Sequence, residues 1–253
     1  MGAAIGTERH GVHTWPQIYA RTGGVLYLII IVIGALGEVV VRNGLIVSGD
    51  ATATAEKIRS SEFLWRVGIA GELFLLICAA ALTLIFYILL RPVSRDLALL
   101  AMVFNLVSIA VEADSALHLL ATLFPLGNAN YLKVLDPNQL HAMAYLSIRS
   151  HENGFGVSLI FFGCVCLVDG YLISRSGYLP RVIGVLMQIA GLCYLTNSFA
   201  LILSPSLAHR LFPAILLPAL VGEASLCLWL LVKGVNLQRW KEQASAASGS
   251  WGL

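Results

Sequence analysis

The sequence predicts an all-α protein: a polytopic integral membrane bundle of six transmembrane helices, with short amphipathic helices in the two longer outer loops. Hydrophobic residues make up 58% of the 253-residue chain and charged residues only 12%, about half the charged share of a soluble domain. The mean hydropathy is +0.83. The apolar runs are long enough to cross a bilayer, at roughly 20 residues each, and they lack the alternation of barrel strands. Helices are therefore expected, because a helix satisfies its own backbone hydrogen bonds in lipid.

The six spans follow one another along the chain, and most of them end at residues that stop a helix. An Arg-Pro pair ends the second span, and a proline ends the third. A Ser-Pro pair follows the fifth span and a Lys-Gly pair closes the sixth, as expected where a helix does not continue. The expected bounds are Gly23–Val41, Trp65–Leu90, Leu97–Phe124, Gly154–Ile173, Val182–Leu203 and Leu211–Val232.

The two longer outer loops carry signals for short helices. Asp50 is a candidate N-cap for a helix over Ala51–Ser60, because a short side-chain oxygen can accept a hydrogen bond from the first helical turn. Asp136 is a candidate N-cap for a second helix in which Pro137 takes the first position. Each helix is expected either to lie on the outer face as a lid or to serve as a plain connector.

Lysine and arginine indicate how the chain is oriented. The short loops RPVSRD and SRSGYLPR are both basic, and Asp96 is their only acid. Because positive loops favour the cytoplasmic side, both termini are expected in the cytoplasm. The chain then divides into a cytoplasmic lead-in over 1–20, a six-helix transmembrane domain over 21–236 and a cytoplasmic tail over 237–253. The small polar residues of the tail predict that it is disordered.

Ionisable and amide side chains interrupt the apolar runs at one depth. Counted from the ends of the spans, they lie between the midplane and the outer surface, with the exception of Asp169 near the inner end of the fourth span. This asymmetry predicts a polar chamber that is open to the outside above a dry seal. The acids are Glu38, Glu72, Glu112, Asp114 and Glu223, and the residues that accompany them are His118, His151, Glu152 and Asn197.

Apart from Arg66 at the outer end of the second span, the expected spans contain no lysine or arginine to pair with these acids. An unpaired carboxylate at the bilayer centre costs about 2.5–3.5 kcal/mol on insertion scales. Three remedies are open: protonation, a bound cation or metal, or an arginine reaching in from the rim, where Arg42, Arg66 and Arg149 stand. Glu38, four positions before Arg42, is expected to form an interfacial ion pair with it. Glu223 is expected to be neutral unless a cation is bound.

The third span places two acids on different faces. Asp114 and His118 are four positions apart and therefore share a face. We expect them to meet His151 or Glu152 of the fourth span, as metal ligands or as a proton relay. The alternative is a closed Asp–His hydrogen bond among apolar neighbours. Glu112 points the other way and is expected to face the spans that carry the remaining glutamates, so that the third span is central.

Several stretches together resemble a bacterial membrane family catalogued as domain of unknown function 4386. The resemblance covers roughly Arg21 to Val235 and implies a polytopic protein of the bacterial cytoplasmic (inner) membrane. It implies no activity and no functional residues. The stretches are RTGGVLYLIIIVIGALGEVVVRNGLIVSGDATATAEKI, YILLRPVSRDLALLA, SHENGFGVSLIFFG, GYLISRSGYLPRVIGVL and LLPALVGEASLCLWLLVKGV.

Composition excludes some functions and leaves three open. The formal net charge of +2, without a basic tract, gives no sign of a nucleic-acid partner. The preferred function is binding or transport of a small cation, an amine or an amphiphile, since carboxylates inside a membrane mark such pathways. The expected ligand-binding residues are Glu72, Glu112, Asp114, His118, His151, Asn197 and Glu223.

Two alternatives belong to other classes of protein. One is a membrane-embedded, metal-dependent lipid hydrolase with a divalent metal held by Asp114, His118, His151 and Glu152, although the chain lacks the HxxxH and HExxH spacings. The other is an accessory subunit of a membrane complex, whose acids are packing struts or contacts to a partner. The lipid bilayer is an expected partner in every case, and a homo-oligomer is compatible with each.

Overall fold

The structure is a computed structural model that describes residues 15–249, and this part of the chain is helical without a strand. Six of its helices are long and apolar enough to cross a membrane. The first of these is α1 (Trp15–Leu36), which continues through the π-helical segment η1 (Gly37–Arg42) into α2 (Asn43–Leu45). The others are α4 (Glu62–Leu90), α5 (Arg95–Ala121), α7 (Pro137–Ser176), α8 (Arg181–Leu203) and α10 (Leu217–Val232).

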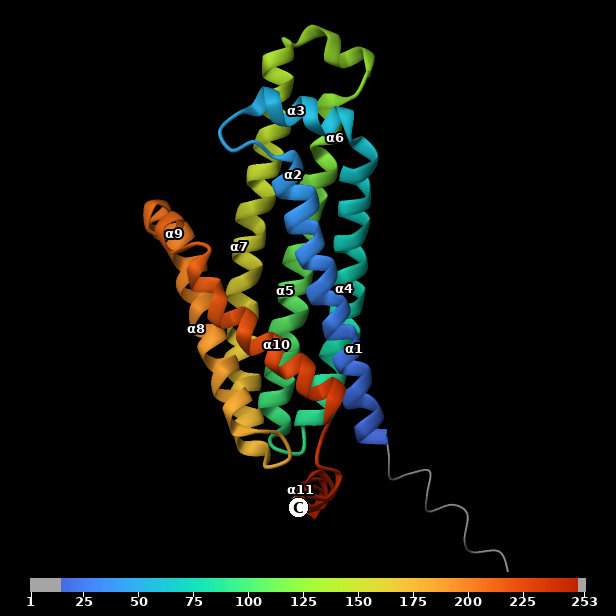
Figure 1. Ribbon diagram of the computed structural model, residues 1–253, viewed down its shortest axis with the longest axis vertical. Coiled ribbons are helices and arrows are strands. Elements are labelled where there is room, and N and C mark those ends of the chain that lie inside the picture. Colours follow the sequence, from blue (N-terminus) through green and yellow to red (C-terminus); the bar gives the residue numbers. More distant parts are fainter. Residues whose placement is uncertain (1–14, 250–253) are drawn as a thin grey trace, which may run out of the picture.

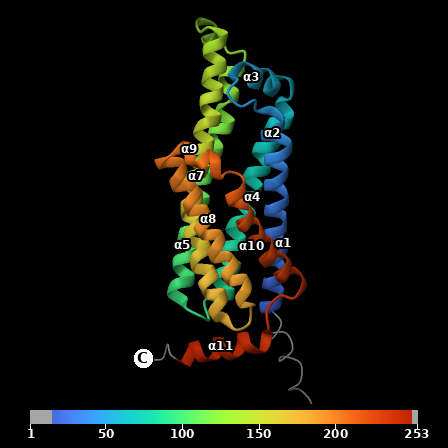
Figure 2. The ribbon, with the colours of Figure 1, turned by 60° about the vertical axis from the view of Figure 1, so that its left-hand side comes forward.

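The helices form an elongated bundle whose two ends differ (Figure 1). At one end, which we call the terminal end, α1 begins and α11 (Leu237–Gly249) lies across the bundle (Figure 2). The opposite end, called the loop end, carries α3 (Ala51–Ser60), α6 (Leu123–Leu126) and the 3-10 helix η2 (Asn130–Val134). Helix α5 packs against both α4 and α7, which confirms that the third span is central.

The helix caps expected in the two outer loops are present. The Asp50 side chain accepts a hydrogen bond from the Ala53 backbone N–H at the start of α3. Asp136 caps α7 with Pro137 in the first position, and Gln139 completes a capping box. The second loop helix is nevertheless not separate, because it and the fourth span form the single 40-residue helix α7. At a rise of about 1.5 Å per residue, α7 extends well beyond a hydrocarbon core of about 30 Å.

The first and sixth spans differ from their expected bounds. The first continues to Leu45, so that Arg42 lies inside it rather than at its rim. The sixth does not begin as a helix at Leu211: α9 (Pro205–Leu211) and the 3-10 turn η3 (Ala214–Leu216) precede α10. Prolines at the starts of these short segments lack the N–H that a longer helix needs, so the chain breaks there.

The C-terminal tail, which was expected to be disordered, forms α11 as far as Gly249. It is held by Trp240, whose ring nitrogen donates to the backbone oxygen of Leu89 at 3.1 Å, and whose ring packs edge-to-face on Trp15. The Tyr178 hydroxyl donates to the same Leu89 oxygen at 2.6 Å. These bonds satisfy a carbonyl at the C-terminal end of α4 that the helix itself leaves without a partner. One buried aromatic residue therefore orders a segment of low hydropathy.

Glycines let α7 and α8 approach each other closely. A Cβ atom on Gly184 would lie 2.5 Å from the backbone oxygen of Gly170, and one on Gly191 would lie 2.6 Å from the backbone oxygen of Gly163. On each helix, the two contacts are about two helical turns apart. Small residues at such crossings permit the close backbone packing that holds helices together in lipid.

We predict that Gly184→Ala destabilises the protein by about 1–3 kcal/mol or more, the range for overpacking, because the obstructing oxygen belongs to the backbone. Equilibrium unfolding of the purified protein in detergent measures the change. Gly44→Ala is the matched control, since a Cβ at Gly44 meets nothing within 4 Å, and alanine favours a helix. Equal stability of the two variants would contradict the packing role.

Candidate functional site

Arg42 lies at the centre of a polar cluster in the loop-end half of the bundle. Its Nε donates to Glu38 Oε2 at 2.6 Å, and its Nη1 donates to Glu72 Oε2 at 2.9 Å. The Glu72 side chain is 10% exposed, whereas the Glu38 side chain is 48% exposed. The expected Glu38–Arg42 ion pair is therefore present, and the same guanidinium also neutralises a glutamate on another span.

His151 of α7 joins this cluster through both ring nitrogens. Its Nε2 lies 3.3 Å from Arg42 Nη1, and its Nδ1 lies 3.2 Å from the backbone oxygen of Ser115 and 3.1 Å from Ser115 Oγ. A guanidinium only donates hydrogen bonds, so Nε2 accepts and the proton is assigned to Nδ1. His151 is thereby a neutral ring that links η1, α5 and α7. The Ser115 hydroxyl returns a bond to the His151 backbone oxygen at 2.7 Å.

Glu112 adds a third carboxyl group to the cluster. It lies within electrostatic range of Glu72 and Arg42, as expected from its stripe on the third span. Among the described residues it has no hydrogen-bond partner, and Glu72 Oε1 is also buried without one. We call Glu38, Arg42, Glu72, Glu112, Ser115 and His151 the Arg42 cluster. It contains three carboxyl groups and one guanidinium.

Two glycines bring the helices of the cluster together. A Cβ on Gly68 of α4 would lie 2.8 Å from Val41, the neighbour of Arg42. Gly68 is one turn before Glu72, so this contact sets the distance from Glu72 to Arg42. A Cβ on Gly154 of α7 would lie 2.8 Å from Ser115 Oγ. The absence of side chains at these two positions therefore permits both halves of the cluster to form.

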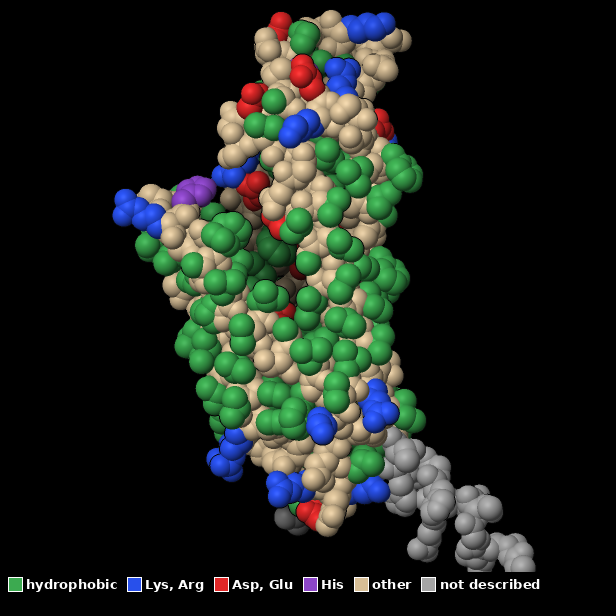
Figure 3. Space-filling view, in the orientation of Figure 1, with side chains coloured by type: hydrophobic (Ala, Val, Ile, Leu, Met, Phe, Trp, Pro, Cys, Tyr) green, Lys and Arg blue, Asp and Glu red, His purple; other side chains and the backbone are tan. Residues whose placement is uncertain are grey.

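One face of the molecule is hollowed. In Figure 3 a depression lies above α10, between the splayed end formed by α9 and the helix that contains α1 and α2. Acidic side chains are visible at its rim and deeper within it, among apolar side chains (Figure 3). A chamber in the loop-end half was expected from the depth of the polar residues, and this hollow occupies that half.

The predicted pairing of Asp114 with His118 is not present. Asp114 is exposed, and among the described residues the two side chains form no hydrogen bond or ion pair with each other. Glu152 is instead paired with Arg149 on its own helix. His118 lies within electrostatic range of His151, yet His151 binds Ser115 and Arg42. The third span is rotated so that Ser115, rather than Asp114, faces α7.

The expected divalent-metal site is not formed by the described residues. They contain no group of three or more His, Cys, Asp or Glu side chains that could hold a metal ion. The four expected ligands, Asp114, His118, His151 and Glu152, are therefore not brought together in this arrangement. The geometry gives no support to the metal-dependent hydrolase.

The two remaining predicted residues lie apart from the Arg42 cluster. Glu223 of α10 accepts a short hydrogen bond from the Tyr194 hydroxyl of α8, and Tyr27 of α1 lies within electrostatic range of it. Glu223 thus connects α10 to α8 through a neutral donor. Asn197 lies on α8, and its Oδ1 is buried without a partner in the described part of the chain.

Sequence reasoning named Arg42 as the partner of Glu38 and as one of three arginines that could reach in from the rim, but not as the centre of the cluster, and it missed Ser115 and Tyr194. The spacing of Glu38 and Arg42 in an otherwise apolar run was the available signal for Arg42. No pattern marks Ser115, because its role depends on which face of α5 meets α7.

The descriptions of the family and the relative that match this chain name no activity. A protein of Archaeoglobus fulgidus, described only as an uncharacterized protein, is 26% identical over 169 residues, which are 67% of this chain and 85% of that protein. No solved structure matches the chain. The family model described as "Domain of unknown function (DUF4386)" matches residues 22–234, which include nearly all of the six spans and every residue of the Arg42 cluster. The chain therefore belongs to the DUF4386 family.

Proposed function

We propose that this protein binds a small organic cation, such as an amine or a cationic amphiphile. It moves this ligand across the membrane or presents it at the membrane surface. The ligand's charge is taken up by the carboxyl groups of the Arg42 cluster, and its apolar part lies in the hollow beside them. The metal-dependent hydrolase is not proposed, because no observation favours it.

The excess of carboxyl groups over cations carries this proposal. Glu38, Glu72 and Glu112 lie near a single guanidinium, and the hydrogen bonds of His151 leave it neutral. Arg42 gives bonds to only two of the three acids. In a medium of low dielectric constant, the remaining carboxylate is costly unless a cation approaches it or a proton neutralises it. With all three carboxyl groups ionised the cluster has two negative charges in excess, so a ligand with one positive charge reduces this excess and one proton removes the rest.

The hollow supports the chemical class proposed for the ligand. It is bordered by apolar side chains as well as by acids (Figure 3), so a ligand with a charged group and an apolar group suits it better than a bare metal ion. Pockets for small molecules commonly combine an apolar lining with a few polar groups that fix orientation. The cluster supplies that polar side on α4, α5 and α7.

We also propose that the chain lies in the bacterial cytoplasmic membrane with both termini in the cytoplasm, so that the hollow opens outward. The support is the basic character of the two short loops at the terminal end, which contain Arg91, Arg95, Arg175 and Arg181.

Labelling of single introduced cysteines tests this orientation. Glu56→Cys on α3 and Gln238→Cys on α11 both place the thiol at exposed positions at opposite ends of the bundle. A membrane-impermeant maleimide added to intact cells is expected to label position 56, and to label position 238 only after permeabilisation. The unaltered chain, whose cysteines lie within the spans, gives the background. The reverse labelling pattern would overturn the orientation.

Binding of dodecylamine to the full chain in lipid nanodiscs tests the function. We expect dodecylamine to bind saturably and dodecanoate, of the same chain length and opposite charge, not to bind. Glu112→Gln removes the acid without a partner and is expected to weaken dodecylamine binding by about tenfold or more, which is about 1.4 kcal/mol. Glu62→Gln is the matched control, because Glu62 pairs with Arg66 at the exposed surface. Equal binding of both ligands, or unchanged binding in Glu112→Gln, would contradict the proposal.

The stability of the cluster depends on Arg42. We predict that Arg42→Gln destabilises the protein by about 3–5 kcal/mol, because it leaves the buried Glu72 without its cation. Arg66→Gln, which breaks a half-exposed pair with Glu62, should cost no more than about 1 kcal/mol. Chemical unfolding in detergent measures both. Combining Arg42→Gln with Glu72→Gln is expected to recover part of the loss, and no recovery would argue against an ion pair as its cause.

A further inference from the structure

A second buried acid lies in the other half of the bundle. Asp169 of α7 is 6% exposed, and it forms no hydrogen bond or ion pair with any residue in the described part of the chain. It is seven positions before the end of α7, which places it about 10 Å inside that end of the helix. Unlike Glu72, it has no arginine beside it.

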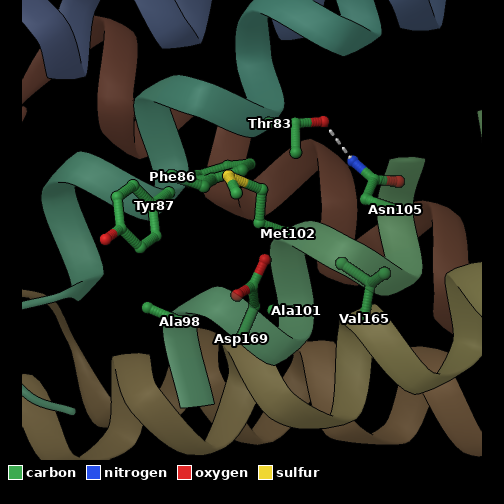
Figure 4. A pocket seen from close by; sticks show the side chains of 9 residues that line it. All are labelled: Thr83, Phe86, Tyr87, Ala98, Ala101, Met102, Asn105, Val165 and Asp169. Carbon is green, nitrogen blue, oxygen red and sulfur yellow. Dashed lines mark hydrogen bonds between the residues drawn. The ribbon is translucent and has the colours of Figure 1, made fainter. Parts of the chain in front are cut away.

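The Asp169 carboxyl group points into a small cavity between three helices. Figure 4 shows the two carboxyl oxygens directed into the space below Met102 of α5, with Tyr87 of α4 on one side. The far wall is formed by Asn105, whose amide nitrogen donates to Thr83 Oγ1 at 2.6 Å. The cavity volume is about 10 Å³, which is enough for about one water molecule.

The size and lining of the cavity restrict what it can hold. A volume of about 10 Å³ excludes an alkyl amine of the kind proposed for the Arg42 cluster. No charged group of the described chain offsets the burial of Asp169. The nearby titratable side chains are Tyr87 on α4, which lines the same cavity, and Cys166 on α7 itself, and Asn105 on α5 is uncharged. A buried carboxylate without a cation is strongly disfavoured, so the missing partner is a small positive species from solution.

We propose that Asp169 and its cavity form a binding site for one small monovalent cation, Na⁺ or a proton. The site is separate from the Arg42 cluster and does not rest on the function proposed for it. Both candidate ions share the same chemistry, which is neutralisation of one buried carboxylate. Helices α4, α5 and α7 contribute to both sites, at different depths.

The Na⁺ form is tested by thermal unfolding of the full chain in detergent, with NaCl replaced by choline chloride at constant ionic strength. If Na⁺ is the ligand, the wild-type Tm is expected to rise with Na⁺, by about 3–6 °C at ten times Kd. Asp169→Asn should abolish that rise. Asp96→Asn is the matched control, because Asp96 is exposed at the start of α5, and it should keep the wild-type response.

The proton form is tested by infrared spectroscopy of the same proteins in Na⁺-free buffer. If a proton is the ligand, the wild-type spectrum contains a carboxylic-acid band that disappears in Asp169→Asn and persists in Asp96→Asn. In either form, Asp169→Asn in Na⁺-free buffer should be at least as stable as the wild type, since the amide needs no cation. The proposal is overturned if Asp169→Asn changes neither the Na⁺ response nor the acid band. It is also overturned if Asp169→Asn is markedly less stable than the wild type in Na⁺-free buffer.

Discussion

The guanidinium of Arg42 is the interaction on which the loop-end half of the bundle depends. Glu72 is placed on a membrane-spanning helix where an unpaired carboxylate is disfavoured, and Arg42 Nη1 lies 2.9 Å from it. The same nitrogen lies 3.3 Å from His151. One side chain therefore fixes the relative positions of the helix that contains η1, α4 and α7. Because a guanidinium has five donors in a rigid plane, it can hold these groups in a single arrangement.

The terminal-end half is stabilised differently. There α7 and α8 are in close backbone contact at Gly170 and Gly184, and the buried side chains are largely apolar, with Leu89, Leu172 and Leu230 among them. Van der Waals packing of this kind leaves little free space. The cavity at Asp169 is notable for that reason: it is a polar space within a closely packed region, whereas the hollow near the Arg42 cluster is open at the surface (Figure 3).

The sequence predicted the fold class, the central third span and the N-caps at Asp50 and Asp136, because these depend on local signals such as hydropathy, turn residues and side-chain acceptors. It also predicted that polar groups gather in one half of the bundle. It could not predict which face of α5 meets α7. Helical spacing gives the angle between two side chains on one helix, and not the rotation of that helix against its neighbours. Because of this rotation, Ser115 rather than Asp114 takes the position that faces His151.

The Arg42 cluster and the Asp169 cavity are connected by the helices that they share. His151 and Asp169 are both on α7, about 27 Å apart along its axis at 1.5 Å per residue, and α4 and α5 also contribute to both sites. A helix transmits a shift or rotation along its length because its backbone hydrogen bonds keep it rigid. Neutralising Asp169 would remove an unfavourable charge between α4, α5 and α7, and the same helices carry Glu72, Ser115 and His151. Coupling between the two sites therefore requires no contact between their ligands, only a difference in how the shared helices pack with and without each ligand.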